Sequence, residues 1–255
     1  KRIPLGLAVD DLETFVLDLD EGPHFLIAGA PQSGKSTLLK SLLVSLCTLN
    51  DPSRLRLYLV DFAGRNLRQL RNLPHVEKFI ASYEALGEAM EEIREELRRR
   101  REAIDVGDED ENAARDTYKV AEKPLLVMAI DDFYLFGDIA SSQSKDELER
   151  IIRRERGCDF FLVMAGTTSD LSSCWDGYVK AFMEMQTGFL LGSTGHDDQS
   201  VLKLRLPSSE TGQVLPPGLG YFARRGMARK IKVALPAREG ITISEYLESL
   251  RACGG

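Results

Sequence analysis

The chain has 255 residues, 43% of them hydrophobic and 29% charged, and its formal net charge is −7. This acidic balance argues against a protein whose main task is to grip DNA, because neutralised phosphates supply much of that affinity. The four cysteines form no CxxC pair, which argues against a zinc site or a disulfide framework and favours a reducing compartment. The sequence contains no uninterrupted run of about 18 apolar residues, so no membrane span is predicted. Because the chain does not begin with Met, we expect it to be a piece of a longer protein.

Short apolar runs alternate with stretches of helical periodicity along the chain. Strands are predicted at 24–29, 55–61, 124–132, 159–168 and 187–193. Helices are predicted at 37–49, 83–104 and 145–156, followed by a hairpin over 220–235 and a last helix capped by Ser244. Fully apolar strands between helices require a sheet that is covered on both faces. The sequence therefore predicts one α/β domain over 1–255 with a mostly parallel sheet, and the hairpin is expected to extend one edge.

Two charged segments lie near the end of the second predicted helix. Four consecutive arginines occupy 98–101. They are interpreted as a solvated helix end, because arginine favours a helix C-terminus and acidic residues flank the run. The stretch 105–112 is interpreted as an acidic loop. Neither segment is read as a nucleic-acid site.

A glycine-rich segment, Gly29-Ala-Pro-Gln-Ser-Gly-Lys-Ser36, follows the first predicted strand and precedes a helix. It matches the P-loop pattern, in which backbone N–H groups and a helix N-terminus cradle phosphates. Lys35 is expected to reach the β- and γ-phosphates, and Ser36 to ligate Mg²⁺. We therefore predict that ATP and Mg²⁺ are the cofactors. The loop residues predicted to bind them are Gly29, Gln32, Ser33, Gly34, Lys35, Ser36 and Thr37.

Two adjacent carboxylates end the third predicted strand. Asp131 stands where a Walker B aspartate holds Mg²⁺ through water. Asp132 stands where additional-strand P-loop ATPases usually carry the glutamate that polarises the attacking water. Aspartate is one methylene shorter, and a displacement of about an ångström can lower a rate on the order of a hundredfold. Asp132 is therefore either a weak catalytic base or a carboxylate that only supports the metal, and whether the chain hydrolyses ATP stays open.

Other classes of P-loop protein carry signatures that this sequence lacks. It has no NKxD motif after the Walker B strand, which argues against a small GTPase. It has no LSGGQ-like signature, which argues against a transporter cassette, and no arginine-rich lid, which argues against a small-molecule kinase.

Several motifs spread over nearly the whole chain resemble those of FtsK/SpoIIIE-type ATPase domains. They are "GPHFL" ahead of the P-loop, "LVDF" and "LPHV" after it, "LLVMAIDDF", and "LPPGLG" near the C-terminus. More narrowly, they resemble one module of the EccC/EssC ATPase of type VII secretion. The "LDLDEGPHFLIAG" opening, the Asp-Asp pair and "LLGSTGHDDQ" are most similar to its C-terminal module, while "GAPQSGKST" also suits the middle one.

This resemblance implies a RecA-like fold and a tandem array of such modules behind a membrane anchor. The fragment itself would then work at the cytoplasmic face of the cell membrane, and would meet the membrane only through other parts of the full chain. Neighbouring ATPase domains, of the same chain or of an oligomer, are the first partners that the resemblance implies.

In this family an arginine of one module completes the nucleotide site of the next. The matching cluster consists of Arg150, Arg153, Arg154 and Arg156. Arg153 or Arg154 is the expected trans-acting arginine finger, and the alternative is an exposed basic face balanced by glutamates. Thr167 is expected either to sense the γ-phosphate or to cap a turn. Asp61 is expected either to cap the turn after its strand or to lie near the edge of the site.

The resemblance also implies a protein client. C-terminal modules of this type resemble receptors for the helical export signal of small secreted proteins, which would dock in an apolar groove. The candidate contacts are Leu171, Trp175, Tyr178 and Phe182, although their helical spacing fits a core stripe better.

Two functions from different classes stay open on the sequence. In the first, the chain is an ATP-binding and client-recognition module of a secretion motor, with little or no turnover alone. In the second, it is a competent FtsK/SpoIIIE-like motor that translocates DNA. Asp132 and the acidic net charge favour the first, whereas the intact Lys35, Ser36 and Asp131 allow the second.

Overall fold

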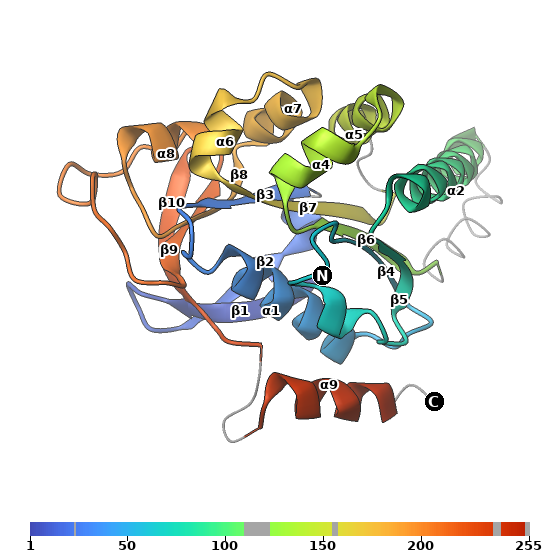
Figure 1. Ribbon diagram of the computed structural model, residues 1–255, viewed down its shortest axis with the longest axis horizontal. Helices are drawn as coiled ribbons and strands as arrows, with labels where there is room; N and C mark the ends of the chain where they lie inside the picture. The colour runs from blue at the N-terminus through green and yellow to red at the C-terminus, as the bar shows by residue number, and fades with distance from the viewer. Residues whose placement is uncertain (23, 110–122, 155–157, 237–240, 253–255) are drawn as a thin grey trace.

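One sheet of ten strands runs through the molecule, in the order β2-β1-β10-β9-β8-β3-β7-β6-β4-β5 (Figure 1). The computed structural model describes residues 1–22, 24–109, 123–154, 158–236 and 241–252. Helices cover both faces of the sheet, and each face has its own apolar core. This is the doubly covered α/β arrangement that the fully apolar strands predict.

The parallel half of the sheet consists of the strands that the sequence predicts, together with one that it does not. They are β3 (His24–Gly29), β4 (Leu55–Val60), β5 (Val76–Ile80), β6 (Leu125–Ile130), β7 (Phe160–Thr167) and β8 (Thr187–Leu191). Every residue of β3 and β6 is buried. The strand missed by the sequence analysis, β5, is the outermost strand on its side and is only partly buried, so it lacks a continuous apolar signature.

Two hairpins continue the sheet beyond β8. The predicted C-terminal hairpin is β9 (Leu219–Arg224) and β10 (Met227–Val233), and its strand β9 pairs with β8. The expectation that this hairpin forms an edge of the sheet is wrong, because β10 also pairs with β1. An unpredicted N-terminal hairpin, β1 (Arg2–Ala8) and β2 (Thr14–Asp18), lies outside it, so that β2 is the outermost strand. Pro4 and Gly6 mask β1 in the sequence. Gly6 is required there because a Cβ atom would lie 2.0 Å from the Lys232 carbonyl oxygen of β10.

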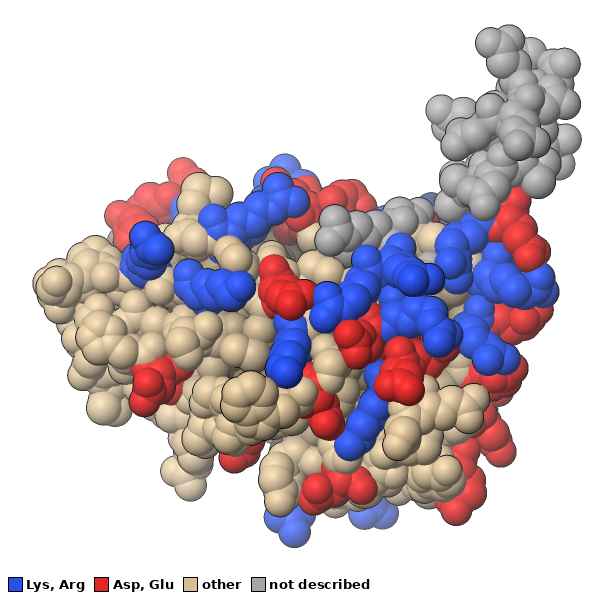
Figure 2. Space-filling view, turned by 90° about the horizontal axis from the view of Figure 1, so that it is seen from above, with Lys and Arg blue, Asp and Glu red and all other residues tan. Residues whose placement is uncertain are grey.

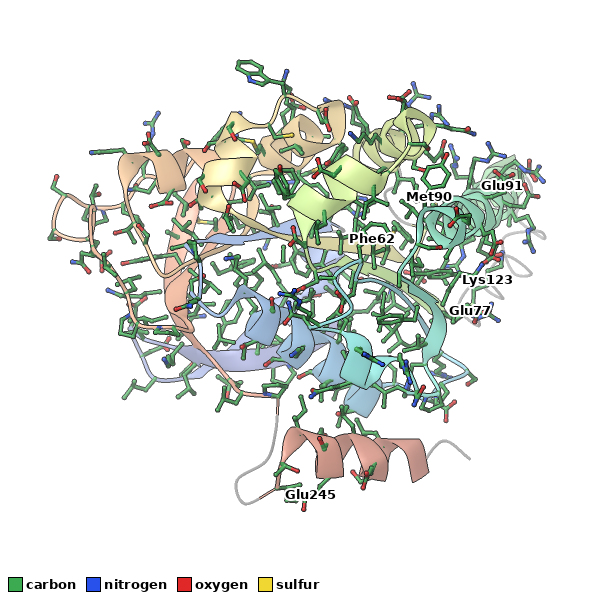
Figure 3. The ribbon with its side chains drawn as sticks, viewed as in Figure 1. Phe62, Glu77, Met90, Glu91, Lys123 and Glu245 are labelled. Carbon is green, nitrogen blue, oxygen red and sulfur yellow. The ribbon has the colours of Figure 1, made fainter. Side chains whose placement is uncertain are left out.

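The helices form two layers (Figure 1). On one face lie α1 (Lys35–Leu49) and α9 (Ile243–Ala252). The other face carries α2 (Tyr83–Glu109), α4 (Phe133–Ile139), α5 (Ser142–Arg154), α6 (Thr168–Ser173), α7 (Gly177–Met185) and α8 (His196–Val201). Short 3₁₀ turns occupy Leu19–Glu21 and Arg68–Leu70. The amphipathic prediction for α2 is confirmed, since Met90 is buried in the core on this side of the sheet and the next residue, Glu91, is exposed (Figure 3).

Two local predictions at helix ends are wrong. The last helix begins after Thr242, whose hydroxyl accepts a hydrogen bond from the Glu245 N–H at 3.3 Å, while the Glu245 carboxylate accepts from the Thr242 N–H at 2.8 Å. Thr242 is therefore the cap, in a capping-box arrangement, and Ser244 lies inside the first turn. In addition, α2 extends to Glu109, so the first part of the predicted acidic loop is helical. Residues 110–112 of that loop lie outside the described residues.

Arg100 corrects the interpretation of the four consecutive arginines as a solvated helix end. Its side chain is only 1% exposed. The guanidinium donates to Glu96 at 2.8 Å, to the Cys158 carbonyl at 2.9 Å and to the Pro124 carbonyl at 2.9 Å. Pro124 directly precedes β6 and Cys158 lies two residues before β7, so Arg100 fastens α2 to the starts of two central strands. A buried guanidinium needs such partners.

Charges are mixed on the helical face of the molecule. Figure 2 shows Lys and Arg side by side with Asp and Glu over this face. Part of the mixing comes from ion pairs within helices, such as Arg94–Glu91 and Arg98–Glu95. Among the described helices, none is both long and apolar enough to cross a membrane.

Replacing Arg100 should destabilise the fold far more than replacing its neighbour. Arg100→Met would leave the Cys158 and Pro124 carbonyls without this donor and would remove the nearer of the two arginines that pair with Glu96. We expect a loss of about 3 kcal/mol in the free energy of unfolding. Arg99→Met is the matched control, because Arg99 is 60% exposed and pairs with Glu96 at only 3.6 Å. Its expected loss is below about 0.5 kcal/mol. Urea unfolding at equal m-values measures both, and equal midpoints for the two variants would contradict this role of Arg100.

Candidate nucleotide-binding site

The glycine-rich segment forms a tight loop between the end of β3 and the start of α1. Gln32 and Gly34 have left-handed φ values of 59° and 99°, and Gly34 is the N-cap of α1. The strand–loop–helix context required of a P-loop is therefore present.

Lys35 lies folded across this loop. Its ammonium donates to the Gly29 carbonyl at 3.2 Å and to the Ala30 carbonyl at 2.7 Å. Burial lowers the pKa of Lys35, whereas the negative charges of Asp131, Asp132 and Asp170 act to raise it. The cation is thus held among loop carbonyls and carboxylates, at the position from which a P-loop lysine serves phosphates.

Asp131 lies at the end of β6, as the Walker B prediction requires, and is 7% exposed. Its Oδ2 atom accepts a hydrogen bond from the Asn66 side-chain amide at 2.6 Å. Its Oδ1 atom is buried and has no hydrogen-bond donor among the described residues. Burial raises the pKa of Asp131, while the Asn66 and Ser36 side chains act to lower it. One carboxylate oxygen is therefore held firmly, and the other is left for a further ligand.

These residues fit Mg²⁺. The unpartnered Oδ1 of Asp131, the nearby Ser36 hydroxyl and the surrounding carboxylates supply the oxygen-rich, negative environment that this ion prefers. Ser36 would hold the ion directly and Asp131 through water. The ion, when bound, would neutralise negative charge on the nucleotide phosphates.

Asp132 serves as the N-cap of α4 and is exposed. Its Oδ1 accepts from the backbone N–H groups of Tyr134 at 3.0 Å and Leu135 at 3.2 Å. These two hydrogen bonds hold the Asp132 carboxylate against the first turn of α4. Neither of the two sequence interpretations of Asp132 included this capping role. Its part in catalysis stays a prediction.

Thr167 also serves as a helix cap. It ends β7, and its hydroxyl accepts from the Asp170 N–H at 3.3 Å. The capping alternative for Thr167 is therefore present in the structure, and contact with a γ-phosphate stays a prediction.

The arginine cluster is remote from the P-loop of the same chain. Arg153 and Arg154 end α5, and the chain then enters β7 at its start, whereas the P-loop follows the carboxyl end of β3. Arg153 donates to Glu149 at 2.8 Å and to Glu184 at 2.5 Å. Arg156 lies outside the described residues. A role for Arg153 or Arg154 at the site of a neighbouring module stays a prediction.

Two glycines that the sequence analysis did not assign to the site press against the P-loop. The Gly218 N–H donates to the Ser33 carbonyl at 2.8 Å, and a Cβ atom on Gly34 would lie 3.0 Å from the Gly218 nitrogen. A Cβ atom on Gly192 would lie only 2.4 Å from the Ser33 Cβ. The "LLGS" and "LPPGLG" segments therefore support the nucleotide loop, although they are far from it in the sequence. The available signal was that both segments belong to motifs that carry the family resemblance, "LLGSTGHDDQ" and "LPPGLG".

Asp61 takes the turn-capping role that was one of its two predicted alternatives. Its Oδ2 atom accepts from the backbone N–H groups of Asn66 at 3.0 Å and Leu67 at 2.8 Å. This turn places Asn66 against Asp131. Sequence reasoning missed Asn66, because its role depends on two strands that are adjacent only in the folded sheet.

The proposed apolar client stripe separates into core and surface residues. Leu171, Tyr178 and Phe182 are buried, as the core interpretation expects. Trp175 is 81% exposed, and the Lys180 ammonium lies over its ring, 4.9 Å from the ring centroid. The chain is not helical between Ser173 and Gly177, so the four residues do not share one helix.

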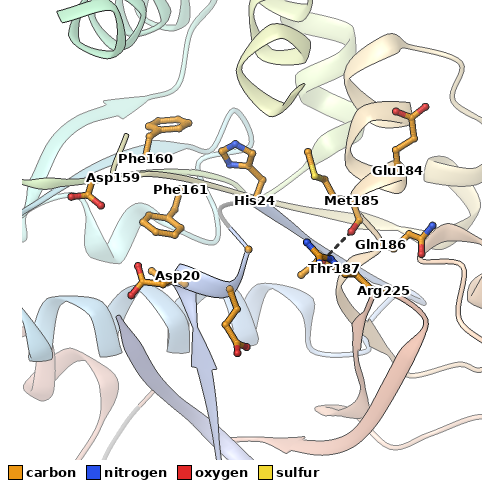
Figure 4. A pocket seen from close by; sticks show the side chains of 13 residues that line it. Asp20, His24, Asp159, Phe160, Phe161, Glu184, Met185, Gln186, Thr187 and Arg225 are labelled. Atoms are coloured by element: carbon orange, nitrogen blue, oxygen red, sulfur yellow. Dashed lines mark hydrogen bonds between the residues drawn. The ribbon is translucent and has the colours of Figure 1, made fainter. Parts of the chain in front are cut away.

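A separate pocket of about 520 Å³ lies at the amino end of the parallel strands (Figure 4). Its lining includes His24 at the start of β3, Phe160 and Phe161 at the start of β7, and Arg225 of the β9–β10 turn. The Arg225 N–H donates to the Gln186 carbonyl at 2.9 Å. None of the predicted nucleotide-binding residues lines this pocket, so it lies apart from the P-loop site.

The family model that matches this sequence agrees with the geometry. A model of the FtsK/SpoIIIE family matches residues 2–170. The chain belongs to the FtsK/SpoIIIE family. P-loop ATPases of this kind use a nucleotide and Mg²⁺ in general, which fits the loop and the strand-end carboxylate described above.

FtsK/SpoIIIE relatives of two kinds resemble the chain. The DNA translocase SftA of Bacillus subtilis is 32% identical over 195 residues, which are 74% of this chain and 20% of SftA. The ESX secretion system protein EccC of Thermomonospora curvata is 26% identical over 235 residues, 91% of this chain and 17% of EccC. The chain thus spans about a fifth of the length of these relatives.

Solved structures of FtsK/SpoIIIE-related ATPases share the fold. EssC (ATPases 2 and 3) from Geobacillus thermodenitrificans matches with a TM-score of 0.80 at 19% identity, over 99% of this chain and 49% of that chain. T. curvata EccC (ATPases 2 and 3) in complex with a signal sequence peptide matches with a TM-score of 0.71 at 24% identity, over 94% of this chain and 41% of that chain. The predicted RecA-like P-loop fold is confirmed.

The support that Gly192 gives to the P-loop can be tested against a second left-handed glycine. Gly192→Ala would place a methyl group on Ser33 and shift the loop, so we expect ATP affinity to fall about tenfold or more. Gly212→Ala is the matched control, since Gly212 has nearly the same φ, 77° against 79°, but nothing within 4 Å of its added Cβ. It carries the same backbone strain without the clash. Titration with a fluorescent ATP analogue compares them, and equal losses of affinity would show that Gly192 matters only for its φ.

The raised pKa of Asp131 means that the ionised form of its carboxylate, which magnesium binding requires, lowers the stability of the fold. Because burial favours the protonated form, the folded state binds this proton more tightly than the unfolded chain does, so ionised Asp131 lowers stability at neutral pH. The penalty disappears as the pH falls through the folded-state pKa. We expect Asp131→Asn to raise the free energy of unfolding by about 1 kcal/mol near neutral pH and to lose this advantage in acid. Urea unfolding of both proteins between about pH 4 and pH 8 measures this difference in the free energy of unfolding. A difference that does not change with pH would contradict the raised pKa of Asp131.

Proposed function

We propose that this chain is an ATP-binding module of a type VII protein secretion motor, formed by residues 1–255 as a single domain of a longer protein. The observation that carries the proposal is the junction of the P-loop with Asp131, whose free Oδ1 lies buried beside Lys35 and Ser36. The similarity to EccC over 91% of the chain supports a role in secretion rather than in DNA translocation. The nucleotide is Mg·ATP, bound through the loop residues and Asp131.

The module has weak or no hydrolysis on its own. Asp132 is shorter than the usual glutamate and is tied to the first turn of α4 by two hydrogen bonds. The expected arginines, Arg153 and Arg154, lie away from the P-loop of their own chain, so they would act on a neighbouring module. Turnover would therefore need both a neighbour and a reoriented base.

A helical export signal of small secreted proteins is the proposed client. Support comes from a relative: T. curvata EccC has been solved in complex with a signal sequence peptide. The module would meet neighbouring ATPase domains of the same chain or oligomer, at the cytoplasmic face of the cell membrane. Contact with the membrane itself would come from other parts of the full-length protein.

The alternative is an FtsK/SpoIIIE-like DNA translocase. It is favoured by the 32% identity to SftA and by the complete set of Lys35, Ser36 and Asp131. The net charge of −7 and the mixed charges of the helical face weigh against it (Figure 2).

ATP binding and turnover test the proposal. We expect Lys35→Ala to lower ATP affinity by on the order of a hundredfold, because the ammonium pairs with the terminal phosphates. Lys40→Ala, later on the same helix, is the control and should change affinity little. Unchanged affinity in the Lys35 variant would remove the P-loop from the proposed function.

Asp132→Glu separates the two functions. If the native residue limits hydrolysis, turnover of the variant should exceed that of the native chain by about tenfold, at a cost of about 1 kcal/mol from the weakened α4 cap. Motor-like turnover by the native chain would contradict the weak-hydrolysis proposal.

DNA binding with a steep salt dependence would favour the translocase. Fluorescence of the single, exposed Trp175 offers a readout for an added signal-sequence peptide.

A further inference from the structure

We propose that Asn66 is a positioning residue that fixes which oxygen of Asp131 faces the magnesium ion. The inference rests on the proposed function, because it assumes that Mg·ATP binds at the P-loop. Asn66 would not bind the ion or the nucleotide itself. It would act through Asp131, by holding the Oδ2 atom so that the Oδ1 atom alone is presented.

The hydrogen bonding of Asp131 is asymmetric. Its Oδ2 atom accepts from the Asn66 Nδ2 at 2.6 Å, whereas its buried Oδ1 atom has no donor among the described residues. An amide NH₂ group only donates, so it binds a carboxylate oxygen and cannot ligate a cation through that atom. A donor on one oxygen also stabilises the ionised form of a buried carboxylate. Magnesium binding requires that form.

Asn66 is itself held in place by a compact turn. The Asp61 carboxylate accepts from the backbone N–H groups of Arg65 at 3.4 Å, Asn66 at 3.0 Å and Leu67 at 2.8 Å, and the Asp61 carbonyl accepts from the Gly64 N–H at 3.0 Å. Asp61 is 3% exposed and Leu67 is fully buried, so this turn is anchored in the core.

The sheet sets the distance between the two residues. Strands β4 and β6 are parallel neighbours with Val60 opposite Ile130, so Asp61 and Asp131 leave the sheet side by side. The Asp131 N–H donates to the Val60 carbonyl at 3.2 Å, and the Asp61 N–H donates to the Ile80 carbonyl of β5 at 3.0 Å. Asp61, Asn66 and Asp131 therefore form a chain of contacts across the end of the sheet. Groups that orient a metal ligand in this way commonly change metal affinity by about 10- to 100-fold.

Magnesium titration tests the role of Asn66. ATP-analogue binding is measured for the 255-residue chain in EDTA and at increasing Mg²⁺, which gives the Mg²⁺ concentration at half-maximal enhancement. We expect Asn66→Ala to raise that concentration by about tenfold or more and to leave the affinity in EDTA unchanged. Asn66→Leu, which keeps the volume but has no donor, should show the same shift and covers the case in which the alanine variant folds poorly. Asn72→Ala, an exposed asparagine a few residues later, is the control.

The outcomes distinguish this inference from the function on which it rests. If the native chain shows no Mg²⁺-dependent ATP binding, the proposed function fails. If the native chain binds Mg·ATP but the Asn66 variants need no more Mg²⁺ than it does, the inference alone is overturned. Equal weakening with and without Mg²⁺ would show that Asn66 supports only the loop, and it would also overturn the inference.

Discussion

A carboxylate held almost out of water at the end of a central strand is the constraint on which the nucleotide site depends. Asp131 is 7% exposed, and burial raises its pKa. Burying a charge is unfavourable unless it is partnered. Asn66 partners one oxygen only, and the other oxygen stays without a donor among the described residues. The fold thus retains a locally unfavourable arrangement that a bound cation would relieve, which is typical of functional sites.

The parallel sheet gathers the parts of this site at one end. The P-loop follows β3, Asp61 follows β4, Asp131 follows β6 and Thr167 ends β7. The antiparallel strand β9 begins at the same end, which brings Gly218 against the Ser33 carbonyl. Ligands of open α/β sheets bind at the carboxyl ends of the strands for this reason. The close approach of two glycines, Gly218 to the Ser33 carbonyl and Gly192 to the Ser33 side chain, then shapes the nucleotide loop.

The opposite end of the sheet has a different character. Arg100 fastens α2 to the starts of β6 and β7 there, and Arg153 joins Glu149 and Glu184 in an ion-pair network nearby. The pocket of about 520 Å³ opens at this end as well (Figure 4). The candidate nucleotide site therefore lies at the carboxyl end of the parallel strands, and the ion pairs and the pocket lie at their amino end. In the proposed tandem array, the arginines of one module would face the P-loop of another.

Local patterns in the sequence determined the central strands, the P-loop and the Walker B aspartate, because each is encoded by neighbouring residues: a continuous apolar run, a glycine spacing, or a carboxylate directly after a strand. The half-exposed strands β1, β2 and β5 lacked such a pattern. Only the tertiary structure decided that Arg100 is buried, that Asp132 and Thr167 cap helices, and that Gly192, Gly218 and Asn66 belong to the site. The two caps are local contacts, and the structure decided them by fixing where α4 and α6 begin. The other roles arise from contacts between segments far apart in the chain, and periodicity or spacing carries no record of which segments the sheet makes neighbours.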